Sequence, residues 1–275
     1  MSGLGAAAIA AAFRAACLDE LQALKPGNVH VHAAGHRMTV RDFEASAEAA
    51  APHVAARGAS VGARILGAMR ATWAAVGQNT NLGILLLAGP LAAAAERGGE
   101  PWVAIAEVLA GLDARDAEDV FAAIRLADPG GLGAVPEHDV RGPAGDLLAA
   151  MAAAADRDSI ARQYATGFRD IRIVGLPALD AAVARSGFGP QAVTETYLAF
   201  LAAFPDSHVL RKHGAETAEE IRREASRLRE TVATSEARVI LLQTDSAWKS
   251  RGINPGTSAD LTVATILHRR MWQNT

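Results

Sequence analysis

Asn79-Thr80-Asn81-Leu82-Gly83-Ile84-Leu85-Leu86-Leu87-Ala88-Gly89-Pro90-Leu91-Ala92-Ala93-Ala94-Ala95 joins three polar residues to the longest apolar run of this chain. The run from Leu82 to Ala95 is about 14 residues long and contains Pro90, so it is shorter than the roughly 18 to 20 residues that cross a bilayer. A helix that is apolar on all sides is typical of a protein core. The segment therefore predicts a buried helix inside a larger helical protein.

The remainder of the chain has the same helical character. Alanine, leucine and arginine dominate, and the alternation of β-branched or aromatic residues that is typical of strands is almost absent. We therefore expect an all-α fold, a bundle of mostly antiparallel helices that forms a single nucleotide-binding domain over residues 1–275. The expected helices are 4–23, 42–57, 60–77, 81–97, 101–110, 116–127, 144–155, 158–168, 176–186, 190–203, 216–235, 237–248 and 257–272. The cluster of glycine and proline at 128–145 predicts a linker or an active-site flap.

Composition narrows the class of protein. With 275 residues, 50% of them apolar, the chain can bury a large core, and a net charge of -3 gives no general reason to bind nucleic acid or an anionic membrane. The apolar N-terminal run lacks a positively charged leading region, so we expect a cytoplasmic protein. The single cysteine, Cys17, is expected to be a buried apolar residue, and a homodimer is the default expectation for an enzyme of this size.

Lys25-Pro26-Gly27-Asn28 is the first of two polar islands at the junctions of predicted helices. The proline keeps Lys25 out of the preceding helix, and Gly27 allows backbone amides to approach an anion. A plain Pro-Gly turn has the same requirements without any ligand. Glu20 lies about one helical turn before Lys25, where its carboxylate can hold Mg²⁺, accept a proton or form an exposed salt bridge.

The second island is the start of the apolar helix. Asn79 fits a helix N-cap, and Asn79, Thr80 and Asn81 together place amides and side-chain oxygens where a phosphate or its Mg²⁺ could bind. Gly83 would let another helix or a ligand come close to this helix end.

Two further groups of candidate functional residues occur in the C-terminal part of the chain. Asp206 and the pair Arg211-Lys212 fall between predicted helices, which suits a Mg²⁺-triphosphate, although Asp206 is equally suited to cap a short helical turn. Thr257 and Asp260 have the spacing of a capping box at the start of the last helix, so Asp260 can be read as a cap or as a functional carboxylate.

The order of these motifs is similar to that of the triphosphoribosyl-dephospho-CoA synthase family. The resemblance covers most of the chain and includes Glu20 before the Lys-Pro-Gly turn and the Asn-Thr element. Three further elements carry it, namely Gly35-His36-Arg37-Met38-Thr39, Asp206-Ser207-His208-Val209-Leu210-Arg211 and Asn254-Pro255-Gly256-Thr257-Ser258-Ala259-Asp260.

The resemblance implies transfer of a 5-triphosphoribosyl group from ATP to dephospho-CoA with release of adenine, in the synthesis of a cofactor or prosthetic group. ATP and a small-molecule acceptor are the implied partners, with Mg²⁺ as the expected cofactor. We expect Glu20 or Asp260 to act as the catalytic base, and Glu20 and Asp206 to bind Mg²⁺. The residues expected to bind substrate are Lys25, Gly27, Asn28, His36, Asn79, Thr80, Asn81, Arg211, Lys212 and Ser258.

The chain also departs from the pattern of that family. Better-known members read approximately Asn-Thr-His-Lys-Gly where this chain has Asn79-Thr80-Asn81-Leu82-Gly83, which indicates a divergent branch. A related nucleotide-dependent ribosyl or phosphoribosyl transferase of another cofactor pathway is therefore an alternative. A helical protein that binds a nucleotide without catalysis is another. Release of adenine with a suitable acceptor distinguishes the first hypothesis from the last.

Overall fold

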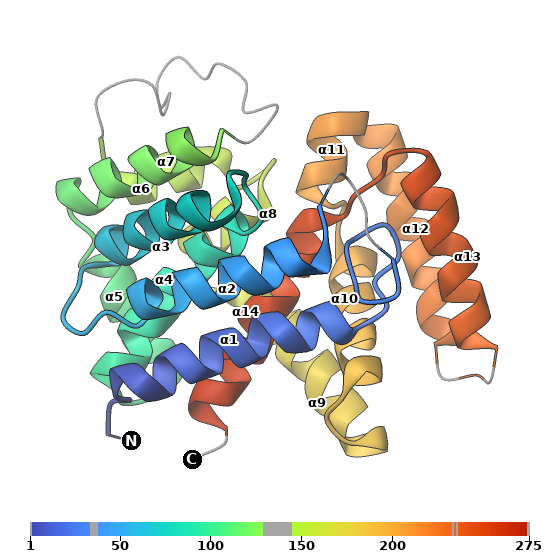
Figure 1. The fold of residues 1–275 in the computed structure, drawn as a ribbon, viewed down its shortest axis with the longest axis horizontal. Helices are drawn as coiled ribbons and strands as arrows, with labels where there is room; N and C mark the ends of the chain where they lie inside the picture. Colours follow the sequence, from blue (N-terminus) through green and yellow to red (C-terminus); the bar gives the residue numbers. More distant parts are fainter. Residues whose placement is uncertain (1, 34–37, 129–144, 233, 235, 274–275) are drawn as a thin grey trace.

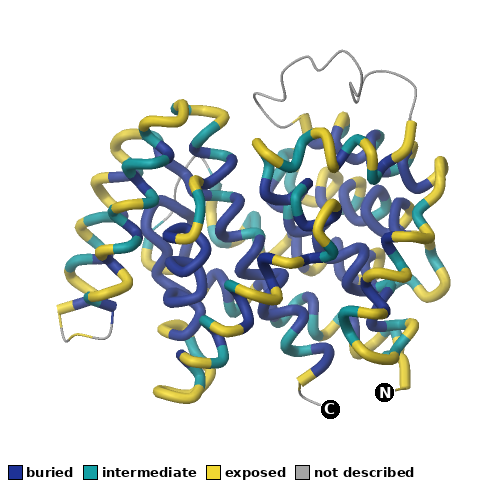
Figure 2. Tube along the Cα trace, turned by 180° about the vertical axis from the view of Figure 1, so that it is seen from behind, coloured by how far each residue is buried: buried dark blue, intermediate teal, exposed yellow. Residues whose placement is uncertain are grey.

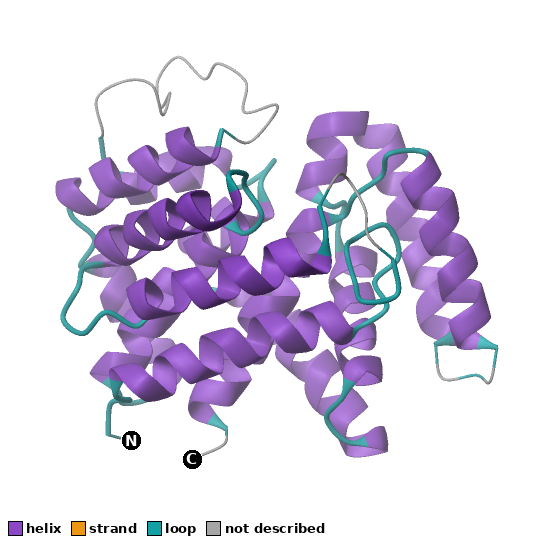
Figure 3. Cartoon of the chain, viewed as in Figure 1, coloured by secondary structure: helices purple, strands orange, loops and turns teal. Residues whose placement is uncertain are grey.

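The chain folds into an array of helices. The structure is a computed structural model that describes residues 2–33, 38–128, 145–232, 234 and 236–273, and within them no strand is present (Figures 1 and 3). The predicted all-α fold is thus confirmed. The elements are α1 (Ala6–Gln22), α2 (Val40–Val54), α3 (Val61–Val76), α4 (Leu82–Arg97), α5 (Pro101–Ala110), α6 (Ala114–Ala127), α7 (Leu147–Ala154), α8 (Ser159–Thr166), a π-helical turn (Ile171–Gly175), α9 (Leu176–Ser186), α10 (Pro190–Ala203), α11 (Ser207–His213), α12 (Ala215–Thr231), α13 (Ala237–Ser250) and α14 (Gly256–Trp272).

The last helix, α14, links two groups of helices. It runs through the middle of the molecule, with α1 to α8 on one side and α10 to α13 on the other (Figure 1). Its residues contribute to both clusters of buried apolar side chains, Leu261 to the larger one and Ala259 to the smaller one. Buried positions accordingly follow the central helices, while exposed positions follow the outer turns (Figure 2). Residues of α14 can therefore face a space between the two groups.

The apolar helix predicted from Leu82 onward is α4, and it is buried as expected. Its side chains Leu85, Leu87 and Leu91 are fully buried. Gly89 lies against Ile65 of α3, where a Cβ atom would come within 2.7 Å of the isoleucine side chain. No helix within the described ranges is long and apolar enough to cross a membrane.

Some predicted helix ends are confirmed and others are wrong. Thr39 and Asp42 form the expected capping box at the start of α2. The one predicted from Thr257 and Asp260 is wrong, because α14 begins at Gly256 and both residues lie inside the helix. Residues 207–213, expected to connect two helices, form α11, whose N-cap is Asp206. The glycine and proline cluster at 129–144 lies outside the described residues.

Candidate active site

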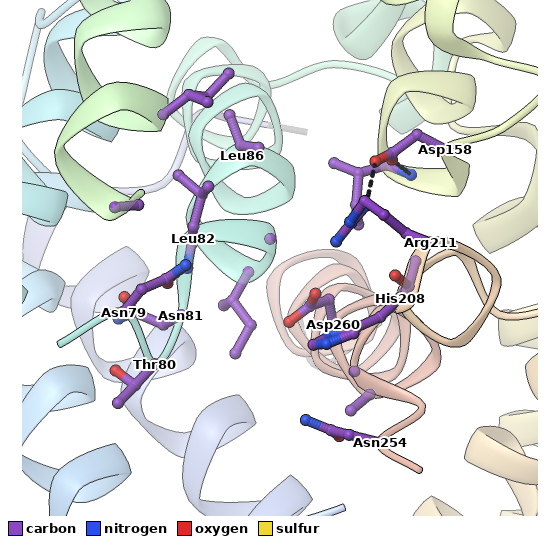
Figure 4. Close-up of a pocket in the computed structure, with 18 of the residues that line it drawn as sticks. Asn79, Thr80, Asn81, Leu82, Leu86, Asp158, His208, Arg211, Asn254 and Asp260 are labelled. Atoms are coloured by element: carbon purple, nitrogen blue, oxygen red, sulfur yellow. Dashed lines mark hydrogen bonds and ion pairs between the residues drawn. The ribbon is translucent and has the colours of Figure 1, made fainter. Parts of the chain in front are cut away.

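A large cavity lies where the two groups of helices meet. Its volume is about 1100 Å³, and its wall combines the end of α1, the start of α4, the loop before α8, part of α11 and the start of α14. Leu82 and Leu86 of α4 face Arg211 and Asp158 across it, with Asp260 between them (Figure 4). Its polar lining residues are Glu20, Asn28, Gln78, Asn79, Thr80, Asn81, Asp128, Arg157, Asp158, His208, Arg211, Lys212, Asn254, Thr257 and Asp260.

Asp260 projects from the second turn of α14 towards the first turn of α4. A Cβ atom added to Gly83 would lie 2.0 Å from Oδ2 of Asp260 and 2.6 Å from its Cγ, so only glycine leaves room for this carboxylate. No described residue forms a hydrogen bond or an ion pair with it. Burial raises the pKa of Asp260 well above its ordinary value, and the negative charges of Glu20, Asp206 and Asp158 raise it further. This carboxylate is therefore suited to take up a proton.

Glu20 lines the cavity from the end of α1 and is paired behind the wall with Lys25. The ammonium of Lys25 is fully buried and lies 2.6 Å from Oε1 of Glu20, and it also donates to the carbonyl oxygen of Val29 at 2.6 Å. Burial raises the pKa of Glu20, and the charge of Lys25 opposes that rise. Lys25 does not line the cavity, but it contacts residues that do, among them Glu20 and Asn28, whose Oδ1 accepts from the ammonium at 3.3 Å.

Gly27 and Asn28 fix the loop after Lys25 to the C-terminal part of the chain. Gly27 has φ +82°, and a Cβ atom there would come within 2.8 Å of Pro255. Its N–H donates to Oδ1 of Asp245 at 2.9 Å. The side chain of Asn28 donates to Oδ1 of Asn254 at 2.8 Å, and both asparagines line the cavity. Gly27 itself is packed behind them.

The island at the start of α4 combines structural and free polar groups. The N-cap of α4 is Asn81, so the prediction that Asn79 is the N-cap is wrong. Oδ1 of Asn79 accepts a hydrogen bond from the N–H of Leu82 at 3.1 Å and so supports the start of the helix from two residues further back. The hydroxyl groups of Thr80 and Ser46 form a hydrogen bond, with 2.6 Å between their oxygens. Asn81 is 4% exposed, and its Nδ2 donates to Thr72, while its buried Oδ1 has no partner in the described structure. An unpaired amide oxygen in a cavity wall is positioned to accept a hydrogen bond from a ligand.

Three cationic side chains form the basic side of the cavity, namely Arg157, Arg211 and Lys212. Arg211 lies 3.4 Å from Asp158, and Lys212 donates to the carbonyl oxygen of Gly252 at 3.4 Å. Both contacts are long, and the three side chains remain available to an anion in the cavity.

Asp206 and Ser258 lie outside the cavity wall, in contact with each other. Oδ2 of Asp206 accepts from the N–H and the Oγ of Ser258 at 2.7 and 2.8 Å, while Oδ1 accepts from the N–H groups of His208 and Val209. Asp206 is 1% exposed and caps the starts of α11 and α14 together. The structure thus confirms the helix-capping role that the sequence allows for this carboxylate. No group of three or more histidine, cysteine or acidic side chains suited to a metal ion occurs among the described residues.

Of the remaining predicted residues, His36 lies outside the described part of the chain. The sequence interpretation also missed several lining residues. Asn254 and His208 line the cavity and belong to the sequence elements at 254–260 and 206–211, from which the sequence predicts Ser258, Asp260, Asp206 and Arg211 instead. Asp158, the N-cap of α8, and Trp73, which is 38% exposed, also line the cavity, and no local motif distinguishes either residue.

Comparison with known proteins places these motifs in one family. The sequence profile of the CitG family, described as ATP:dephospho-CoA triphosphoribosyl transferase, matches residues 6–275. The fold is similar to a crystal structure from Archaeoglobus fulgidus of a protein assigned as a triphosphoribosyl-dephospho-CoA synthase. That similarity has a TM-score of 0.64 and 28% sequence identity, and it covers 83% of this chain and 98% of the other. Among curated proteins no match is found.

Proposed function

The chain belongs to the CitG family of ATP:dephospho-CoA triphosphoribosyl transferases, and we propose that it transfers the 5-triphosphoribosyl group of ATP to dephospho-CoA within the cavity. The observation that carries this proposal is the unpaired carboxylate of Asp260, which shares one cavity with the cationic side chains of Arg157, Arg211 and Lys212. A glycosyl transfer from a triphosphate needs both elements, because it moves a hydroxyl proton and must hold a polyanion.

We propose that the two ends of ATP bind at opposite sides of this cavity. The triphosphate pairs with the basic side, where guanidinium groups suit phosphate oxygens. The start of α4 is a poor place for phosphate, because the carboxylate of Asp260 already lies beside Gly83 and would repel it. The ribose and the acceptor hydroxyl therefore belong next to Asp260, where the unpaired oxygen of Asn81 can accept a hydrogen bond from a hydroxyl or an amino group.

The chemical step needs one proton acceptor. In this proposal Asp260 takes the proton of the attacking hydroxyl of dephospho-CoA. At the same time the oxygen of that hydroxyl forms a bond to C1′ of the ribose of ATP. The bond between C1′ and the adenine nitrogen breaks, and the bonding electrons leave with adenine, which gains one proton from water. The hydroxide that remains takes the proton held by Asp260, so that water and the carboxylate are restored. Lys25 holds the carboxylate of Glu20 at the cavity wall, and the negative charge of Glu20 adds to the effect of burial in raising the pKa of Asp260.

Mg²⁺ would fit next to Asp260. The negative charges of Glu20, Asp206 and Asp158 raise the pKa of Asp260, and a bound cation would relieve the repulsion between these carboxylates. Glu20 lines the cavity and can supply a ligand, whereas both oxygens of Asp206 already accept hydrogen bonds. Phosphate oxygens and water would complete the coordination. When bound, Mg²⁺ would neutralise charge on the triphosphate. We also propose that the protein is located in the cytoplasm, where ATP is available, and that it forms a homodimer.

The test is release of adenine, measured by chromatography, from Mg²⁺-ATP mixed with dephospho-CoA. Adenine should appear only when both substrates are present, and Asp260→Asn should lower kcat by about 100-fold or more, as expected for loss of a general base. Glu48→Gln changes an exposed residue that does not line the cavity, and it should leave kcat unchanged. Absence of adenine release by the wild-type protein, or full activity of Asp260→Asn, would refute the proposal.

A further inference from the structure

One side of the cavity is apolar and is not used by the chemistry proposed above. It is formed by α4, α6, α7 and α8, and its larger side chains remain 4–8% exposed although they belong to helices of the main core. We call it the apolar half. Its larger side chains are Leu86, Phe121, Ile124, Met151 and Ile160, and Trp73 lies at its edge.

Trp73 is placed there by the packing of α3 against α6. The N–H of Gly62 donates to Oδ1 of Asp116 at 2.6 Å, so the two helices start side by side. Their last turns then both reach the cavity, with Trp73 and Gly77 from α3 and Ile124 and Ala127 from α6. A tryptophan with 38% of its surface exposed at the edge of an apolar cavity offers a ligand a large flat contact surface.

The parts of ATP do not suit the apolar half. Its triphosphate needs cations, and these lie on the basic side of the cavity. The adenine of ATP carries ring nitrogens and an amino group, and the larger side chains of the apolar half offer these groups no hydrogen-bond partner. At about 1100 Å³ the cavity is also larger than the roughly 300 to 1000 Å³ that is usual for one small molecule, so there is space for a second substrate.

The acceptor has a part that suits it. Dephospho-CoA consists of an adenosine diphosphate portion and a long uncharged arm that carries methyl groups, two amides and a terminal thiol. We infer that the apolar half binds this uncharged arm, with Trp73 covering it, and that the arm holds the acceptor in place while its reacting hydroxyl lies next to Asp260. This inference rests on the proposed function. It makes Trp73 a residue that determines specificity for the acceptor without taking part in the chemistry.

The experiment is saturation-transfer NMR on dephospho-CoA bound to the full-length protein, combined with calorimetric affinities for dephospho-CoA and for ATP. In the wild-type protein the geminal methyl protons of the arm should receive saturation. Trp73→Ala should reduce that transfer and weaken dephospho-CoA binding by about tenfold, which corresponds to about 1.4 kcal/mol. Its affinity for ATP should stay within about twofold of the wild-type value, a difference below 0.5 kcal/mol.

Phe188→Ala is the matched control, because Phe188 is also 38% exposed and does not line the cavity. It should change neither affinity. A second variant, Met151→Gln, keeps the length of the side chain but makes this part of the apolar half polar, and it should also weaken dephospho-CoA selectively.

Three results would overturn the inference. If Trp73→Ala weakens ATP as much as dephospho-CoA, or if the saturation lost is that of the adenine protons, the apolar half binds the nucleotide. If both cavity variants bind dephospho-CoA normally, the arm lies elsewhere, and adenine release would still support the proposed function. If the wild-type protein shows no binding of dephospho-CoA, the proposed function fails as well.

Discussion

Gly83→Ala should inactivate the enzyme without adding or removing any charged group. An alanine Cβ at this position would lie 2.0 Å from Oδ2, 2.6 Å from Cγ and 3.2 Å from Oδ1 of Asp260. An ordinary non-bonded contact is about 3.5 Å, so the carboxylate must move by about 1.5 Å. The three nearest atoms all belong to one side chain, and that side chain yields more easily than either helix. The proposed base is then displaced from the reacting hydroxyl.

The expected loss is about 100-fold in kcat, because a displacement of about 1 Å at a reacting group can have an effect of this size. Alanine is favoured over glycine inside a helix by about 1 kcal/mol, which offsets part of the strain, so the melting temperature should change little. The assay is adenine release at saturating ATP and dephospho-CoA, with thermal unfolding followed in parallel.

Two controls separate this effect from a general one. Gly5→Ala adds a methyl group where nothing lies within 4 Å and φ is an ordinary -75°, so kcat should stay at the wild-type value. In the Asp260→Asn background, Gly83→Ala should lower kcat little further, because both changes act on one group. A well-folded Gly83→Ala protein that keeps kcat within about threefold of wild type would refute the reasoning, since that change is below 1 kcal/mol.

Lys25→Met should destabilise the fold by about 3 kcal/mol at neutral pH, because it leaves the buried carboxylate of Glu20 without its partner. Burial raises the folded-state pKa of Glu20 above its unfolded value, so the stability that its protonated form contributes is complete below the unfolded pKa and is lost as pH rises through the folded pKa. Urea titrations should therefore show a deficit that shrinks on acidification, and a deficit independent of pH would contradict this account. Asp206→Asn should cost about 3 kcal/mol in urea unfolding, since one amide oxygen cannot serve four donors, whereas Asp146→Asn at the exposed start of α7 should cost less than about 1 kcal/mol. The pH profile of kcat/KM should have an acid limb well above the ordinary pKa of an aspartate, because Asp260 must be ionised to accept a proton and its pKa is raised; a profile that stays flat down to about pH 4 would exclude it as the base.

Local signals predicted much of the fold. The buried helix after Asn81 and the capping box of Thr39 and Asp42 each depend on residues within one or two turns of each other. The prediction failed where a distant residue supplied the cap. Thr257 and Asp260 have capping-box spacing, but Asp206 accepts the N–H of Ser258 from a different part of the chain, and Asp260 is left to face α4.

The sequence by itself determined the all-α class, most of the helices and the set of polar motifs, because helix propensity, capping and apolar runs act over short distances along the chain. The tertiary structure decided which members of those motifs reach the cavity. Glu20 lines it while Lys25 is buried behind it, and Asp260 is unpaired while Asp206 is fully bonded. The accessibility and the pKa of each carboxyl depend on charges and surfaces supplied by helices far apart in sequence, and only the packing of α1, α4, α11 and α14 brings these together.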